Sequence, residues 1–88
     1  MSISVKKNTV AIEADSLDIY LAVSLKDALF ELFEKGKKKV SLDLAAVERI
    51  STPGIQVILS AKKTFNEFNI LSLSEQLSSE LKKMGVEF

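Results

Sequence analysis

The sequence contains no cysteine, no histidine and no tryptophan among its 88 residues. Without cysteine the chain has no disulfide bonds, thiolate nucleophiles or thiolate metal ligands. Without histidine it has no imidazole to bind a metal or to move protons near neutral pH. An enzyme built from this sequence would depend on hydroxyl and carboxylate groups. These absences favour a module that binds other molecules, and they indicate no cofactor and no metal.

An excess of charge of either sign is also absent. Twelve Lys and Arg residues balance twelve Asp and Glu residues, so the formal net charge is zero. Proteins that bind nucleic acids usually carry excess positive charge, so we expect no nucleic-acid partner. No apolar run approaches the roughly 18 residues of a membrane span, and the N-terminus lacks the apolar region of a signal peptide. We therefore expect a cytoplasmic protein without direct membrane insertion.

Glycine and proline are scarce, with three and one residue respectively, and they separate periodic stretches instead of forming a linker. The chain is 47% hydrophobic and 27% charged, which is typical of a folded domain. Its length leaves room for one small core. We expect residues 1–88 to form a single domain.

The first half of the chain predicts two strands and a helix. Ile3 and Val5 alternate with polar neighbours, residues 6–8 indicate a turn, and Val10 and Ile12 continue the alternation to Ala14. A helix is predicted over residues 20–35, ending at Gly36. Its apolar stripe comprises Leu21, Leu25, Ala28, Leu29, Leu32 and Phe33.

The second half predicts a strand through Val40, Leu42 and Leu44, reached from the earlier strand through a helix and therefore parallel to it. A second helix is predicted from the Thr52-Pro53 pair to about Phe68. Its expected buried stripe comprises Gly54, Ile58, Ala61, Phe65 and Phe68. Its expected polar stripe comprises Gln56, Ser60, Lys63 and Glu67.

A fourth strand is predicted near residues 70–73, followed by a third helix with Ser74 as its N-cap. This helix should bury Leu77, Leu81 and Met84 and end at Gly85. Residues 86–88 predict either a last strand or a docked tail. The predicted fold is a small α/β sandwich in the order β-β-α-β-α-β-α. It has a mixed sheet of four to five strands and three or four helices on one or both faces.

The start of the second predicted helix is the most informative segment. Thr52 is a suitable N-cap, Pro53 suits the first helical position, and Gly54 allows close approach to other backbone. The same arrangement places a hydroxyl at the positive end of a helix, where a phosphate would be favoured. A capping role and a modified or binding hydroxyl both remain open on these residues alone.

Residues 40–59 resemble the central segment of STAS domains, the sulfate-transporter and anti-sigma-factor-antagonist modules. That segment has a strand ending in Leu-Asp-Leu, a short loop, and Asp-Ser/Thr-x-Gly-Leu at a helix start. Here the matching residues are Leu42-Asp43-Leu44 and Ser51-Thr52-Pro53-Gly54-Ile55. Residues 16–20, 74–77 and 84–86 resemble the flanking parts of the family. The resemblance covers nearly the whole chain and implies a STAS-like fold.

The resemblance also implies a non-enzymatic interaction module. In the anti-sigma-factor-antagonist branch, the hydroxyl residue at the position of Thr52 is phosphorylated by a partner kinase with a histidine-kinase-like ATPase fold. The unphosphorylated form binds that kinase or another regulator such as an anti-sigma factor. Asp18 corresponds to the family's aspartate beside this position, with a helix or turn cap as its alternative role.

The chain departs from the family pattern where Ser51 replaces the usual aspartate and where Pro53 follows the candidate phosphoacceptor. Ser51 is therefore a second candidate phosphoacceptor beside Thr52. Gln56 lies one turn further on, as an interface residue or an ordinary solvated side chain. The predicted partner-binding surface comprises Asp18, Ser51, Thr52, Pro53, Gly54 and Gln56.

Other functions remain open at this point. Free-standing STAS domains also serve as soluble subunits of lipid-transport ABC assemblies or as chemotaxis-linked scaffolds, and docking there needs no phosphorylation. An enzyme would require Asp18, Asp43, Ser51 and Thr52 to converge, and no suitable general base is visible. Asp43 is interpreted as a strand-end carboxylate bound by nearby backbone donors. A weak homodimer through exposed sheet edges or the second helix is a further expectation.

Overall fold

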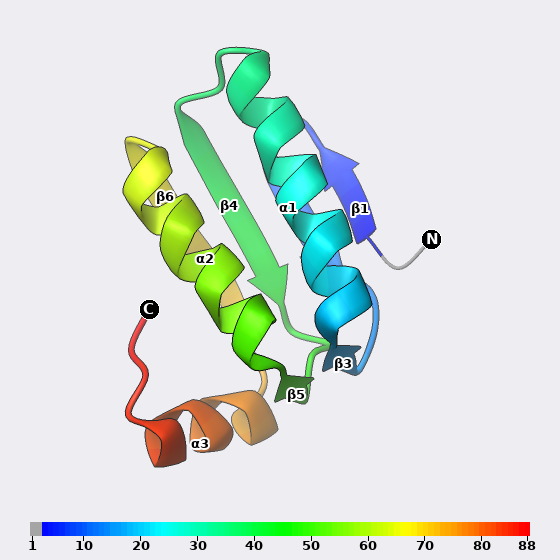
Figure 1. Ribbon diagram of the computed structural model, residues 1–88, viewed down its shortest axis with the longest axis vertical. Helices are drawn as coiled ribbons and strands as arrows, with labels where there is room; N and C mark the ends of the chain where they lie inside the picture. The colour runs from blue at the N-terminus through cyan, green and yellow to red at the C-terminus, as the bar shows by residue number, and fades with distance from the viewer. Residues whose placement is uncertain (1–2) are drawn as a thin grey trace.

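The central element is a four-stranded mixed sheet, seen in a computed structural model that describes residues 3–88 (Figure 1). Its strands are β1 (Ile3–Lys6), β2 (Thr9–Ile12), β4 (Lys39–Leu44) and β6 (Glu67–Leu73), in the spatial order β1-β2-β4-β6. β1 is antiparallel to β2, whereas β2, β4 and β6 run parallel. The predicted mixed sheet and the parallel β-α-β connection are confirmed.

Three helices complete the fold of the described residues, 3–88. α1 (Ile19–Glu34) and α2 (Thr52–Thr64) lie side by side over one face of the sheet, and α3 (Glu75–Met84) lies beyond the end toward which β4 points (Figure 1). Two very short strands, β3 (Ser16–Leu17) and β5 (Arg49–Ile50), pair with each other in a second sheet. The predicted α/β order is correct, with these two strands added.

The core lies between the sheet and the helix pair α1–α2. Alternate residues of β2 and β4 face the helices, and Val10, Leu42 and Leu44 are almost completely buried. Their intervening residues Ala11 and Asp43 point to the other face and are only half-buried. Each fully buried leucine contributes on the order of 1.5–3 kcal/mol of transfer free energy. A shift of one residue would move these side chains to the other face of the sheet, so their burial fixes the register in which β2 and β4 pair.

α1 buries a slightly different stripe from the predicted one. Ala22 is buried together with Leu25, Leu29 and Leu32, whereas the predicted Leu21 and Ala28 are half-buried and Phe33 is exposed. Leu21 and Ala28 border the side of α1 that faces β1, and Phe33 lies on the opposite side, toward α2. The helix ends as predicted, with Gly36 in the left-handed conformation at φ +80°.

α2 ends earlier than the sequence predicts, at Thr64. Phe65 is buried but extended, and Phe68, predicted as the last buried residue of the helix, pairs with Val40 within the sheet. Glu67, predicted on the polar stripe of the helix, is likewise in β6. The apolar residues at 61, 65 and 68 have the spacing of a helix face, whereas Phe68 and Ile70 alternate as in a strand. Pairing with β4 places Phe68 and Ile70 in the strand β6.

The C-terminal segment follows the prediction with two corrections. Ser74 is the N-cap of α3, since its hydroxyl oxygen accepts from the Leu77 N–H at 3.1 Å, and Gly85 is left-handed at φ +72°. Met84, predicted to be buried, is 45% exposed. Residues 86–88 form no strand; Val86 and Phe88 pack half-buried against the core, as a docked tail. None of the helices in residues 3–88 is both long and apolar enough to cross a membrane.

Candidate functional site

The first turns of α1 and α2 meet at one end of the molecule because β3 and β5 pair side by side. Ser16 pairs with Arg49 and Leu17 with Ile50, in parallel. β3 leads into α1 and β5 leads into α2, so parallel pairing brings the two helix starts together (Figure 1). The site is thus formed by two segments that are distant in the sequence.

Ser51 joins these two segments. Its hydroxyl donates a hydrogen bond to the carbonyl oxygen of Leu17 at 2.9 Å, and the hydroxyl oxygen accepts one from the Gly54 N–H at 3.2 Å. The Ser51 N–H donates to the same Leu17 carbonyl at 2.9 Å. Ser51 is therefore both the N-cap of α2 and a link to the segment that precedes α1.

The predicted N-cap, Thr52, is wrong by one residue. Ser51 has the extended backbone of a cap, with φ −84° and ψ 162°, so Thr52 is the first helical residue and Pro53 the second. Proline suits the first turn of a helix, where its missing N–H removes no helical hydrogen bond. Both Thr52 and Pro53 are exposed. The threonine hydroxyl thus lies at the surface, at the positive end of the helix.

Gly54 allows α2 to pack directly on the β3–β5 pair. A Cβ atom at this position would lie 3.0 Å from Cγ1 of Ile50 and 3.1 Å from Cδ2 of Leu17. These distances are shorter than ordinary carbon–carbon contacts. The sequence predicted that Gly54 allows a close approach to other backbone; the close approach is instead to side chains of the two short strands.

Asp18 lies beside Ser51 as the N-cap of α1. Its carboxylate oxygen Oδ1 accepts a hydrogen bond from the Leu21 N–H at 2.9 Å, and its side chain is exposed. The peptide bond between Leu17 and Asp18 carries the carbonyl that Ser51 contacts. The structure therefore gives Asp18 the capping role that the sequence left open, and it also places Asp18 next to the start of α2.

The remaining predicted residues divide into two groups. Gln56 is exposed on α2, one turn beyond the cap, on the same end of the helix as Thr52. Asp43 accepts from the Ala45 N–H at 3.0 Å, which is the strand-end role expected for it. Its side chain lies on the face of the sheet opposite Leu42 and Leu44, so Asp43 does not join Asp18, Ser51 and Thr52.

Exposed apolar side chains on α1 were missed by the sequence prediction. Ile19 and Val23 are largely exposed, and Tyr20 is 81% exposed. Large apolar residues that are solvent-exposed beside a polar helix start are typical of a protein-interaction surface, with tyrosine a frequent anchor. The sequence did carry a signal for this surface, because apolar residues cover a wider arc of this helix than its buried residues occupy.

Nothing at this end of the molecule forms an evident metal site. Among residues 3–88, no three His, Cys, Asp or Glu side chains are grouped so that they could hold a metal ion. Arg49 and Asp15 form an exposed ion pair at 3.6 Å, which supports the β3–β5 pairing only weakly. The chemistry offered here is a hydroxyl, two helix N-termini and neighbouring apolar side chains.

A small mixed α/β domain, with two helices over one face of a four-stranded sheet and their starts joined by the β3–β5 pair, is compatible with a STAS-like fold. The family model for the STAS domain matches residues 3–88. The chain belongs to the STAS domain family. STAS domains are generally non-catalytic. Comparison with curated protein sequences found no match.

Proposed function

We propose that this STAS domain is a partner-switching module resembling an anti-sigma-factor antagonist. The unphosphorylated domain binds a kinase or an anti-sigma factor with a histidine-kinase-like ATPase fold through the starts of α1 and α2. Phosphorylation of Thr52 releases that partner. The domain itself performs no catalysis and acts in transcriptional or other signal transduction in the cytoplasm.

The single observation that supports this proposal is the division of roles between Ser51 and Thr52. Ser51 makes the capping hydrogen bond and the bond to Leu17, and Ser51 is half-buried. Thr52 is exposed beside it and is not the residue that caps the helix. Modification of Thr52 can therefore proceed without breaking the hydrogen bonds that hold the two helix starts together. Modification of Ser51 would disrupt them, which favours Thr52 over Ser51 as the phosphoacceptor.

The expected effect of the modification is electrostatic. A phosphoryl group adds a charge of about −1.5 to −2 at neutral pH. At the first helical position this charge lies at the positive end of the helix dipole, so the fold tolerates it. A partner that covers the same position must desolvate or oppose that charge, which weakens the complex.

The test is an affinity capture from source lysate with the wild-type chain, Thr52→Val and Thr52→Glu, followed by mass spectrometry. We expect an ATPase of the histidine-kinase-like fold on wild type and on Thr52→Val, and its loss on Thr52→Glu. Ser79→Glu is the matched control, because it adds the same charge at an exposed position of α3. The captured ATPase, incubated with ATP and the domain, should then add one phosphoryl group to Thr52. Retention of the kinase by Thr52→Glu would reject the switch.

A second candidate function is a soluble subunit of a lipid-transport ABC assembly. The observation that favours it is Ser51, which replaces the family's aspartate and is fully occupied by structural hydrogen bonds. The helix start then docks on a transporter ATPase without phosphorylation. In the same capture experiment, a transporter ATPase retained by wild type and by Thr52→Glu would support this function. A chemotaxis-linked scaffold is a variant of the first proposal, distinguished by the partner captured.

A further inference from the structure

The charges of this chain sum to zero, but the fold distributes them unevenly. Strands β2, β4 and β6 are parallel and begin at the same end of the molecule, where α1 and α2 finish and the β1–β2 turn lies (Figure 1). Eight of the twelve Lys and Arg residues belong to three segments at this end, residues 6–7, 35–39 and 62–63. All eight are exposed lysines. We call these three segments together the basic end.

Acidic side chains offset only part of this charge. Three glutamates share the basic end, two in the last turn of α1 and one at the start of β6. Glu31 and Lys35 form an exposed ion pair at 3.5 Å, and so do Glu67 and Lys39. Eight lysines against three glutamates leave a formal charge of +5 here, and therefore −5 on the rest of the chain. The two helix C-termini contribute about −0.5 each, so a clear positive excess remains.

The negative charge on the rest of the chain lies too far away to cancel this excess. The molecule measures 35 Å along its longest axis. In physiological salt, charges are screened over about 8 Å. A surface that touches the basic end is therefore attracted by the local excess of lysine, although the whole chain is neutral.

Stabilisation of the fold accounts for only some of these lysines. Residues 62–63 lie in the last turn of α2 and complement its negative end. Lys7 is the first residue of the two-residue turn between β1 and β2, and at its φ of +55° glycine is preferred. Lys37 and Lys38 lie in the loop after α1, and neither forms an ion pair within residues 3–88. These three lysines indicate a contact outside the fold.

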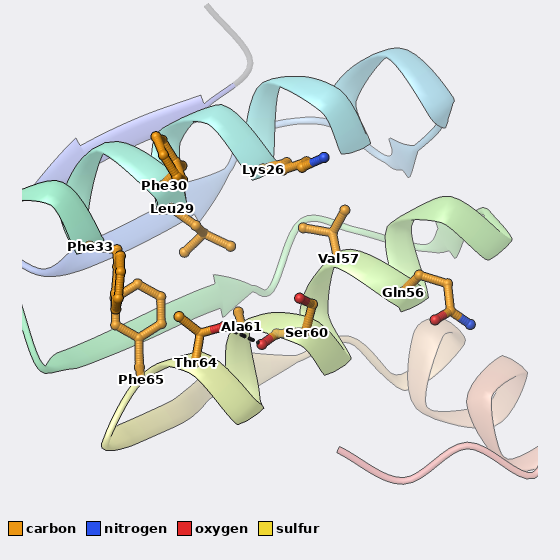
Figure 2. Close-up of a pocket in the computed structure, with 10 residues that line it drawn as sticks. All are labelled: Lys26, Leu29, Phe30, Phe33, Gln56, Val57, Ser60, Ala61, Thr64 and Phe65. Atoms are coloured by element: carbon orange, nitrogen blue, oxygen red, sulfur yellow. Dashed lines mark hydrogen bonds between the residues drawn. The ribbon is translucent and has the colours of Figure 1, made fainter.

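Exposed phenyl rings adjoin the basic end on the last two turns of α1. Phe30 is 62% exposed and Phe33 is 48% exposed. Figure 2 shows Phe30 pointing away from α2, whereas Phe33 turns toward Phe65. The rings of Phe33 and Phe65 meet edge to face, with centroids 6.0 Å apart and an interplanar angle of 84°, at one end of a groove of about 450 Å³ between α1 and α2. Phe30 can therefore contact a surface that attracts the lysines.

Lysines beside an exposed phenylalanine match the surface of an anionic membrane. Anionic headgroups attract the lysines, and an apolar ring enters the boundary between headgroups and acyl chains. Arginine is preferred for nucleic-acid recognition, because its planar guanidinium binds in a bidentate manner. The basic end contains lysine alone, and the one arginine of the chain, Arg49, lies at the opposite end in β5. We propose that the basic end docks this domain peripherally on membranes that contain anionic lipids.

This docking goes beyond the proposed function and involves a different part of the molecule. The starts of α1 and α2, with Thr52, lie at the end opposite the basic end (Figure 1). A domain held on a membrane by its basic end therefore directs Thr52 away from the lipid. A protein partner can then reach the starts of the helices while the domain remains on the membrane.

The test is co-sedimentation of the full chain with vesicles of phosphatidylcholine and phosphatidylserine in equal amounts, against vesicles of phosphatidylcholine alone. Wild type should bind the anionic vesicles only, and salt at about 0.5 M should weaken this binding. A lysine near an anionic surface strengthens binding about fivefold, so Lys37→Gln with Lys38→Gln should weaken it roughly 25-fold. The matched control is Lys82→Gln with Lys83→Gln, an exposed lysine pair on α3, which should leave the affinity unchanged.

A second measurement follows the aromatic contact. The chain contains no tryptophan, so Phe30→Trp introduces a single fluorescent reporter beside the basic end. Its emission should shift to shorter wavelength on anionic vesicles and be quenched by lipids with brominated acyl chains. Tyr20→Trp, at the start of α1, should show neither change. Both positions are exposed, and circular dichroism melts verify that every variant is folded.

Three kinds of result would overturn the proposal. The first is absence of vesicle binding, or equal binding to both kinds of vesicle, or an unchanged affinity after the change of Lys37 and Lys38. The second is tighter binding to a DNA duplex than to anionic vesicles, which would assign the basic end to nucleic acid. The third is salt-sensitive self-association that the same lysine changes abolish, which would assign the basic end to the acidic end of a second copy.

Discussion

The carbonyl oxygen of Leu17 accepts two hydrogen bonds from Ser51, one from its N–H and one from its hydroxyl, each at 2.9 Å. The two residues are 34 positions apart in the sequence. Through this contact the end of β3 is fixed to the start of α2, and Asp18 follows directly as the cap of α1. The relative position of the two helix starts, and so of Thr52, depends on it.

Ser51→Ala should destabilise the domain by about 1–2 kcal/mol, because it removes a helix cap and leaves the Leu17 carbonyl with one donor fewer. Ser51→Asp restores the residue usual in the family and can still cap α2. Its carboxylate cannot donate to the Leu17 carbonyl, so its stability should lie between alanine and wild type. Urea denaturation measures both, with Thr52→Ala as the control expected to change stability by less than about 0.5 kcal/mol. A larger loss for Thr52→Ala than for Ser51→Ala would contradict the assigned cap.

Gly54→Ala should cost about 1–3 kcal/mol, since the added methyl meets Ile50 at 3.0 Å and the fully buried Leu17 at 3.1 Å. The change combined with Ile50→Ala should be less harmful than the sum of the two single changes, because alanine lacks the Cγ1 atom that the added methyl would meet. Thermal or urea unfolding of all four proteins gives this coupling. Gly36→Ala is a useful comparison, because its added methyl meets no atom within 4 Å and its cost arises from the φ of +80° alone. Strict additivity of the Gly54 and Ile50 changes would argue against the close contact.

The edge-to-face pair of Phe33 and Phe65 closes one end of the α1–α2 groove. A double-mutant cycle with leucine at each position should give a coupling free energy of about 0.5–1.5 kcal/mol. Phe65→Leu alone should cost more than Phe33→Leu, because Phe65 is buried and Phe33 is largely exposed. The four denaturation curves provide the coupling. A coupling free energy near zero would show that the two rings do not stabilise each other.

The sequence predicted the elements with clear periodicity and missed those without it. Alternation at Val40, Leu42 and Leu44 was enough to identify β4, and the βαβ rule then supplied its parallel pairing with β2. β3 and β5 have two residues each, too few to show any period, so the feature that joins the two helix starts was not visible. The N-cap of α2 was predicted at Thr52 because the contact between Ser51 and Leu17, which depends on the pairing of these two strands, was not visible either. Serine and threonine are both good N-caps, and the choice is made by the distant Leu17 carbonyl.

The exposure of apolar side chains on α1 could not be predicted from the sequence for a related reason. Phe30 and Phe33 continue the apolar periodicity of the helix, and periodicity alone does not distinguish a buried position from an exposed one at the edge of the stripe. Only the placement of α2 beside α1 shows that part of this arc faces a groove instead of the core. The candidate site residues of α2 were identified because they coincide with a helix start, which has its own sequence signature.

Thr52→Glu should raise the stability of the isolated domain by about 0.3–1 kcal/mol, because it places a negative charge at the positive end of α2. The first turn of this helix consists of Thr52, Pro53, Gly54 and Ile55, none of which is acidic. Thr64→Glu, at the other end of the same helix, should have the opposite effect. Urea denaturation of both variants at low salt and at about 0.5 M salt measures this, and screening should reduce both effects. A stable Thr52→Glu domain means that its loss of a partner reflects the added charge and not unfolding. Destabilisation that salt relieves would instead show that repulsion from the neighbouring Asp18 carboxylate exceeds the attraction of the helix end, and the phosphomimetic would then test two effects at once.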